Sequence, residues 1–164
     1  MKEVPVDEAM LKPYPDKVVL VTCAGADGKA NIIPLGWSMQ TSFRPRLVAI
    51  SVGKTRHSHK LIAESREFVL ALPGEDLAEA VRVCGSSTGR SVDKFKETGL
   101  RKVPSKKVKA PLIGECIANN ECKVIATLDT GDHTIFVGEV VAAYVSDENK
   151  KPLYHFGGHQ LSGL

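Results

Sequence analysis

Residues 31–59 read NIIPLGWSMQTSFRPRLVAISVGKTRHSH, and this stretch decides the fold. It begins with an apolar run at 32–35 and continues through a polar segment at 38–42 that carries three hydroxyls and an amide. The short run at 47–52 is apolar and rich in β-branched residues, which predicts a buried strand. A basic cluster at 56–59 follows at the expected start of a helix. Two strands with a shelf of hydroxyls between them and a basic helix start favour a ligand whose polar tail ends in phosphate.

Length and composition predict one ordinary globular domain over residues 1–164. A chain of 164 residues is long enough to bury a core without disulfides or metals. Its content of 43% hydrophobic and 25% charged residues argues against disorder. The net charge of +3 is too mildly basic to indicate nucleic-acid binding by itself. Trp37 is the single tryptophan and lies within residues 31–59, although a lone tryptophan is also common in a core.

The cysteines and the N-terminus indicate the cellular compartment. Cys23, Cys84, Cys116 and Cys122 form no CxxC pair, and no histidine lies at zinc-finger spacing from them. The charged N-terminus lacks the apolar segment of a signal peptide, and no apolar run approaches the length of a membrane span. We therefore expect a cytoplasmic protein with reduced thiols and no membrane contact. The cysteines are most simply core residues, and Cys84, which precedes a polar glycine-containing loop, is the one to expect near a redox centre.

Strand patterns dominate the rest of the chain. Strands are expected at 18–24, 30–36, 47–52, 67–72, 117–128 and 133–145. Short helices are expected at 58–65, 75–83 and 92–98, with Ser58 as the N-cap of the first. Strands joined mostly by hairpins, with a few short helices, predict a mostly-β barrel. A Rossmann sheet is disfavoured because long helices do not alternate with the strands and no G-x-G-x-x-G is present.

Other kinds of site have weak support in the sequence. The glycine-rich residues 85–89 lack the Lys-Ser/Thr pair of a P-loop, and no G-x-S-x-G marks a serine nucleophile. The histidines are too dispersed to assign a catalytic triad or a metal centre; they are His57, His59, His133, His155 and His159. Five of the nine residues at 101–109 are Lys or Arg, and none is acidic. This basic segment is either a solvated loop or a patch that attracts a phosphorylated dinucleotide.

Three ordered segments resemble one known family. They are NIIPLGWSMQTSFRPRLVAISV at 31–52, CGSSTGRSVDKFKETGL at 84–100, and KAPLIGECIANNECKV followed by GDHTIFVGEVV at 109–141. In this order they resemble the flavin reductase-like, FMN-binding split-barrel family, whose members include flavoredoxins and an archaeal ferric reductase. The resemblance runs from about residue 18 to residue 154. It implies a split β-barrel, a Greek-key antiparallel barrel that dimerises with FMN near the subunit interface.

The resemblance also implies which residues contact the flavin. The expected shelf under the isoalloxazine and ribityl chain is Trp37, Ser38, Met39, Gln40, Thr41 and Ser42, with Ser51 and Val52 ending the strand beside it. The expected phosphate-binding turn is Arg56, His57, Ser58 and His59. The expected loop and helix over the flavin carry Gly89, Arg90, Lys94 and Phe95. Thr88 stands where the family commonly shows a serine, and it keeps the hydroxyl.

These implications lead to an expected activity. We expect an FMN-dependent oxidoreductase that takes hydride from NAD(P)H onto the flavin and passes electrons to a soluble acceptor, such as flavin, ferric iron or a partner protein. The flavin carries this chemistry, so no catalytic side chain is required. One alternative is an FMN-containing electron carrier or flavin-storage protein without its own NAD(P)H step. Another is a nucleic-acid or other binding module that uses the basic segment at 101–109.

Overall fold

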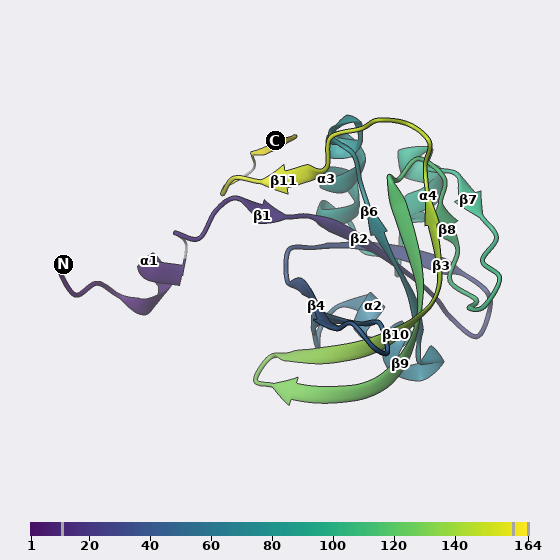
Figure 1. Cartoon of the computed structure of the whole chain (residues 1–164), viewed down its shortest axis with the longest axis horizontal. Coiled ribbons are helices and arrows are strands. Elements are labelled where there is room, and N and C mark those ends of the chain that lie inside the picture. Colours follow the sequence, from purple (N-terminus) through teal and green to yellow (C-terminus); the bar gives the residue numbers. More distant parts are fainter. Residues whose placement is uncertain (11, 159, 164) are drawn as a thin grey trace.

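The fold is built on a seven-stranded antiparallel sheet with the strand order β3-β2-β6-β9-β10-β5-β4 (Figure 1). The computed structural model describes residues 1–10, 12–158 and 160–163. The strands of the sheet are β2 (Val19–Ala24), β3 (Ala30–Leu35), β4 (Ser38–Ser42), β5 (Leu47–Gly53), β6 (Glu67–Leu72), β9 (Ala118–Thr130) and β10 (His133–Val145). Six of these strands were predicted from apolar patterning, and the structure confirms them with bounds that differ by a few residues.

The sheet curls around a core, because side chains from strands far apart in its order pack together. Val21 of β2, Ile50 of β5, Phe68 of β6 and Phe136 of β10 belong to one buried cluster. Each is at most 1% exposed. Burying a side chain of this size contributes about 1.5–3 kcal/mol to folding. The barrel expected from the sequence therefore has its core inside the curl of the sheet.

Short helices cover the sheet and extend the core. They are α2 (His57–Ser65), the 3-10 helix η1 (Glu75–Leu77), α3 (Ala78–Ser86) and α4 (Lys94–Thr98). Val81 of α3 and Phe95 of α4 join Leu20 of β2 and Ile32 of β3 in a second buried cluster. The segment expected to form one helix at 75–83 is thus a 3-10 turn followed by α3, which continues to Ser86.

The prediction that Ser58 caps α2 was wrong. The N-cap is Arg56, in an extended conformation and with no side-chain cap bond. Ser58 lies inside the first turn, is 2% exposed, and its hydroxyl accepts a hydrogen bond from the Asn31 side chain. At α4 the Asp93 carboxylate accepts hydrogen bonds from the backbone N–H groups of the next turn, so the helix begins at Lys94.

Smaller sheets accompany the main one, and the first joins the segment before β2 to the C-terminal segment. β1 (Asp16–Lys17) pairs with β11 (Leu153–His155), which also pairs with β12 (Leu161–Gly163). A further pair joins β7 (Lys102–Val103) to β8 (Leu112–Ile113). The short helix α1 (Val6–Met10) has no buried residue and lies apart from the sheet (Figure 1).

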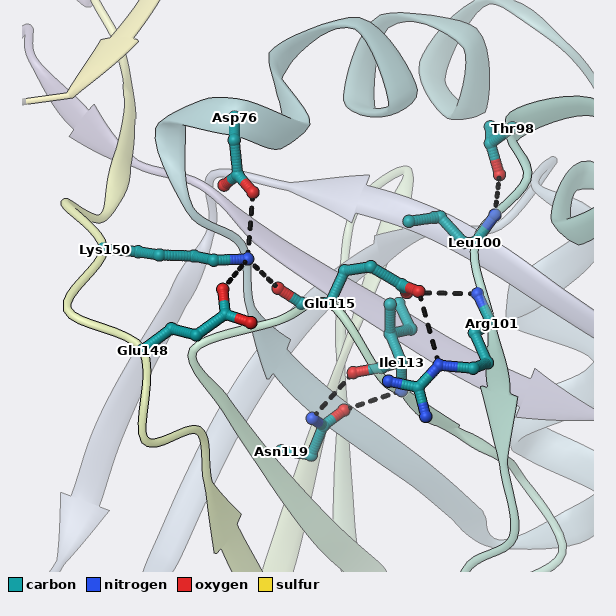
Figure 2. Close-up of polar contacts among 9 residues, drawn as sticks. All are labelled: Asp76, Thr98, Leu100, Arg101, Ile113, Glu115, Asn119, Glu148 and Lys150. Carbon is teal, nitrogen blue, oxygen red and sulfur yellow. Dashed lines mark hydrogen bonds and ion pairs between the residues drawn. The ribbon is translucent and has the colours of Figure 1, made fainter.

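An ionic cluster ties the segment before β11 to the start of η1. The Lys150 ammonium lies 2.9 Å from the Asp76 carboxylate and 2.8 Å from the Glu148 carboxylate, and it donates to the Glu115 carbonyl (Figure 2). These hydrogen bonds raise the pKa of Lys150. The Glu115 carboxylate in turn accepts from the Arg101 backbone and pairs with its guanidinium (Figure 2). The C-terminal segment is therefore fixed beside η1.

The basic segment at 101–109 is held by a buried carboxylate. Glu121 of β9 is fully buried and accepts hydrogen bonds from the backbone N–H groups of Lys106, Lys107 and Val108. The Tyr144 hydroxyl donates a further hydrogen bond of 2.6 Å to the same carboxylate. The segment is thus anchored through its backbone, while its lysine side chains stay exposed.

Candidate functional site

A cavity of about 560 Å³ lies beside β3, at the point where β5 ends, α2 begins and the segment after α3 crosses. Pockets that hold cofactors typically measure 300–1,000 Å³. Asn31, Ile33 and Leu35 lie on the same side of β3 and line the cavity, and Pro34 also contributes to the lining near the end of the strand. At about 3.3 Å per residue these three positions span roughly 13 Å, so the cavity is elongated along β3.

One end of the cavity is basic. Arg56 and His57 at the start of α2, Arg90 from the segment after α3, and Lys94 of α4 line it together. Arg90 donates a hydrogen bond to the Thr55 carbonyl, which joins that segment to the turn before α2. Burial and the positive charges of Arg90, Lys60 and Lys94 lower the pKa of His57. The positive potential at this end suits an anionic group.

Two buried polar groups form the floor next to the basic end. The amide nitrogen of Asn31 donates a 2.7 Å hydrogen bond to the Ser58 hydroxyl. Its amide oxygen is buried and has no hydrogen-bond partner in the described part of the chain. Gly89 crosses directly over this oxygen, and a Cβ atom on Gly89 would overlap it. Any larger residue at 89 would therefore displace either Asn31 or the crossing segment.

The Lys94 side chain is buried and joins two segments that flank the cavity. Its ammonium donates to the Ile32 carbonyl of β3 at 2.9 Å and to the Cys84 carbonyl of α3 at 2.6 Å. Burial lowers the pKa of Lys94 despite the nearby thiols. Burial also raises the pKa of the Cys84 thiol to about 11, so this cysteine, although it lines the cavity, is protonated at neutral pH.

The other end of the cavity is aromatic and more open. Trp37 is 62% exposed, and its ring lies 4.9 Å from the His133 ring, centroid to centroid. The Nδ1 atom of His133 is held 2.7 Å from the Asp132 carboxylate. Tyr14 and His155 also line the cavity, and their rings meet edge to face at 5.0 Å. This end offers faces on which a planar ring system can stack.

A second cavity of about 310 Å³ adjoins the first along β4 and β5. The two cavities share Gly36, Trp37 and Ser51 as lining residues. Met39 and Ile135 add apolar walls to the second one. It lies on an open face of the sheet, where apolar side chains of neighbouring strands remain exposed.

The structure brings half of the sequence-predicted site residues to the main cavity. Those that line it are Trp37, Ser51, Arg56, His57, Ser58, Gly89, Arg90 and Lys94. Ser38 and Met39 line only the second cavity. The remaining six line neither of these two cavities; they are Gln40, Thr41, Ser42, Val52, His59 and Phe95.

Alternation and helical periodicity explain three of these six positions. Val52 lies between Ser51 and Gly53 and points to the opposite side of β5, where it is fully buried. His59 is two positions after His57 on α2, and its ring instead contacts the Thr134 hydroxyl at 2.9 Å. Phe95, next to Lys94, packs in the core.

Several lining residues were not singled out from the sequence. They are Tyr14, Asp16, Asn31, Ile33, Pro34, Leu35, Gly36, Gly53, Thr55, Gly85, Ser87, His133 and His155. Asn31 was quoted as the first residue of the informative stretch but was given no role, and its alternation with Ile33 and Leu35 on the strand is the signal that could have found it. Tyr14 and His155 come from opposite ends of the chain, and only the pairing of β1 with β11 brings them together.

Among the described residues, no group of three or more His, Cys, Asp or Glu side chains is arranged to hold a metal ion. Within the same ranges, no helix is both long enough and apolar enough to cross a membrane. His159 lies outside the described residues. All four cysteines are buried and free, which confirms that they are core residues.

Comparison with known proteins places this geometry in a family. The model of the flavin reductase like domain matches residues 10–163. An uncharacterized protein of Archaeoglobus fulgidus is 41% identical over 128 residues, which cover 78% of this chain and 71% of that protein. A flavin reductase (NADH) of Kitasatospora aureofaciens is 28% identical over 154 residues, covering 90% of this chain and 75% of its own.

A solved structure agrees with the fold described above. The flavoredoxin of Methanosarcina acetivorans superposes with a TM-score of 0.81 at 29% identity, covering 94% of this chain and 86% of that one. The predicted FMN-binding split-barrel fold is thereby confirmed. With a family model that spans nearly the whole sequence, the chain belongs to the flavin reductase-like domain family.

Proposed function

We propose that the chain binds FMN in the main cavity and acts as an FMN-dependent oxidoreductase. One observation carries the proposal: basic side chains gather at one end of an elongated cavity, and an exposed tryptophan lies at the other. FMN has the matching shape, with a dianionic phosphate, a polar ribityl chain and a planar ring system. The flavin reductase and the flavoredoxin to which the chain is similar support this assignment.

The residues present have separate tasks toward FMN. Arg56 and Arg90 hold the phosphate, because a guanidinium makes paired, charge-assisted hydrogen bonds to its oxygens. Trp37 and Ser51 lie beside the ring system, where the tryptophan excludes water from one side. Lys94 keeps β3 and α3 at a fixed separation through its two carbonyl contacts. The bound flavin supplies the redox chemistry, which the protein orients and tunes.

The proposed donor is NAD(P)H and the proposed acceptor is a soluble molecule or protein. The open aromatic end of the cavity, around Trp37 and His133, leaves room for a second planar ring to approach the flavin. Steady-state oxidation of NADH or NADPH by the FMN-loaded protein distinguishes this activity from an electron carrier. A flavoprotein that binds FMN and shows no nicotinamide oxidation would instead be the carrier or storage protein.

We also propose that the protein is a homodimer. Met39 is 58% exposed and Leu128 is 61% exposed, on the same apolar face of the sheet as the second cavity. A second copy seated there would cover this face and close the side of the main cavity next to Trp37. Symmetric dimers are the commonest oligomers of soluble proteins.

The deciding experiment compares FMN with riboflavin, which lacks the phosphate. Arg56→Ala removes a charge-assisted hydrogen bond worth about 1.5–3 kcal/mol. Since each ~1.4 kcal/mol is a factor of ten, FMN affinity should fall about 10- to 150-fold, and riboflavin affinity should hardly change. Fluorescence quenching of each flavin measures both affinities.

The matched control is Arg82→Ala. Arg82 is exposed on α3, pairs with Glu79 and does not line the cavity, so its loss should leave both flavin affinities unchanged. Equal losses of FMN and riboflavin affinity in Arg56→Ala would show that Arg56 supports the ring pocket instead. Absence of FMN binding to the unmodified protein would refute the proposed function.

A further inference from the structure

A chain of side-chain hydrogen bonds joins α2 to the hairpin of β9 and β10. The Nε2 atom of His59 lies 2.9 Å from the Thr134 hydroxyl oxygen, and this hydroxyl donates a 2.9 Å hydrogen bond to the Asp129 carboxylate. Thr134 is 5% exposed, and the His59 ring packs edge to face on Phe136 at 5.3 Å. One buried hydroxyl therefore links the helix to both strands of the hairpin.

Both hydrogen bonds of this chain point toward Asp129. The hydrogen bond from Thr134 and the nearby Lys54 ammonium lower the pKa of the Asp129 carboxyl, so at neutral pH it is ionised and can only accept. The single hydroxyl proton of Thr134 is thereby committed to Asp129. The Thr134 oxygen then accepts from His59, whose imidazole must carry its proton on Nε2. Hydrogen bonds that point the same way polarise one another, so loss of the central hydroxyl breaks the whole chain.

The central hydroxyl lies directly behind a residue of the main cavity. Adjacent residues of a strand face opposite sides, so Thr134 faces α2 while His133 faces the cavity, with its ring 4.9 Å from that of Trp37. His133 is also the first residue of β10, where it pairs with Thr130 and Gly53. Strand ends open more readily than strand centres, so a side-chain tie at 134 restrains the position of His133.

We propose that Thr134 is a positioning residue: through the chain from His59 to Asp129 it holds the His133 ring against Trp37, at the end of the cavity where the nicotinamide donor approaches. The inference rests on the proposed function for its effect on turnover. Its effect on the two rings belongs to the free protein and requires no ligand. A buried residue outside the cavity thus controls how the donor, and not FMN, is bound.

Nuclear magnetic resonance of the ligand-free protein tests the contact between the two rings. Trp37 is the single tryptophan, and its ring current displaces the His133 ring signals, which are identified by their loss in His133→Gln. Thr134→Val keeps the shape of the side chain and removes the hydroxyl, so it should move these signals toward their positions in Trp37→Leu. Thr134→Ser returns the hydroxyl and should restore the wild-type positions. The matched control is Thr127→Val, at an exposed threonine of the same hairpin, which should leave the signals in place.

Turnover of the FMN-loaded protein tests the consequence for the donor. Thr134→Val should raise the KM for NADH or NADPH about two- to tenfold, the range that corresponds to one hydrogen bond, and should change kcat by less than about twofold. FMN affinity, measured by fluorescence quenching, should stay within about twofold, because Thr134 lines neither of the two cavities described above. Thr134→Ser should return the KM to the wild-type value, and Thr127→Val should not alter it.

Several outcomes would overturn the inference. They are unchanged His133 signals in Thr134→Val, signals that move but are not restored by Thr134→Ser, a KM that stays at the wild-type value, and a rise in KM matched by an equal loss of FMN affinity. If Thr134→Val does not fold, His59→Phe carries the same tests, because it removes the donor and keeps a ring against Phe136. A wild-type protein that binds FMN and oxidises no nicotinamide would refute the proposed donor step, and the ring signals alone then decide whether Thr134 positions His133.

Discussion

Individual residues of the basic end determine how the site responds to pH. Burial and the charges of Arg90, Lys60 and Lys94 lower the pKa of His57 below its usual 6.5, so its imidazole is mainly neutral at pH 7 in the free protein. A dianionic phosphate bound beside it has the opposite effect and raises that pKa. Binding of FMN should therefore be accompanied by proton uptake at His57.

Calorimetry in buffers of different ionisation enthalpy measures this uptake directly. We expect net proton uptake on FMN binding at pH 7, less uptake for His57→Gln, and none for riboflavin with either protein. As pH rises above the pKa of the complex, the imidazole stays neutral in both states, so uptake should vanish and FMN affinity should fall. Uptake that is unchanged in His57→Gln would mean that another group takes the proton.

At this scale the sequence predicted the charged residues of the site better than its uncharged ones. The family resemblance assigned Arg56, His57 and Arg90 to the flavin site, and the structure brings all three to the main cavity. Val52 was included by its proximity in sequence to Ser51, yet strand alternation sends it into the core. Asn31 was missed as a site residue, because only the packing of Gly89 and Ser58 around it distinguishes it from any other strand asparagine.

At the scale of structural elements, the middle of the basic segment at 101–109 is held by one buried carboxylate, that of Glu121. Burial tends to raise the pKa of Glu121, but hydrogen bonds from Tyr144 and from three backbone N–H groups lower it below its usual 4.5. A lowered folded-state pKa stabilises the fold above the unfolded value, and this contribution is lost as the pH falls through the folded value. The segment should therefore loosen in acid.

Replacing this carboxylate tests its role. Glu121→Gln should lower the free energy of unfolding by roughly 2–4 kcal/mol at pH 7, because charge-assisted bonds to buried donors are lost. The difference in unfolding free energy between the two proteins should shrink as the pH falls through the lowered pKa of Glu121, where the wild-type carboxylate is protonated too. Urea unfolding at pH 7 and at a series of acidic pH values measures this difference. Glu64→Gln on the surface of α2 is the control, expected to change stability by less than ~1 kcal/mol; a comparable loss there would contradict the assignment.

Among the strands, those with apolar patterning were predicted from the sequence, whereas the polar strand β4 was not. β4 has the sequence SMQTS, which is mostly polar and so lacks the alternation of apolar and polar residues that predicts a strand. It forms because the turn at 43–46 brings it back along β5, where its backbone groups pair. The start of α2 was misplaced for a similar reason, since Ser58 has the chemistry of a cap but makes its hydrogen bond to β3.

The shape of the whole molecule predicts its association. The exposed face of β4, β5, β9 and β10 carries Met39, Leu128 and the partly buried Ile135, and soluble monomers rarely leave such patches uncovered. Leu128→Asp should convert the expected homodimer into a monomer and weaken FMN binding, since the Trp37 side of the cavity then opens to water. Sedimentation equilibrium at micromolar concentration gives the mass.

Val145→Asp is the control for that change. Val145 is 77% exposed at the far end of β10, so a charge there should leave both mass and FMN affinity unaltered. A wild-type protein that sediments as a monomer with FMN bound would exclude the dimer. The family resemblance alone suggested a dimer from the sequence, because exposure of an apolar residue depends on the whole sheet.

The pairing of β5 with β10 also determines at which stage of protein synthesis the cavity can form. Gly53 lies opposite His133, which follows it by 80 residues. On a ribosome that adds ~5–20 residues per second, roughly 4–16 s pass between the synthesis of Gly53 and the synthesis of His133. Both residues line the cavity, together with His155 still later in the chain, so a nascent product that ends before residue 155 lacks part of the wall. Loading with cofactor should therefore follow the synthesis of these late residues, and its rate in the cell then depends on the supply of free flavin.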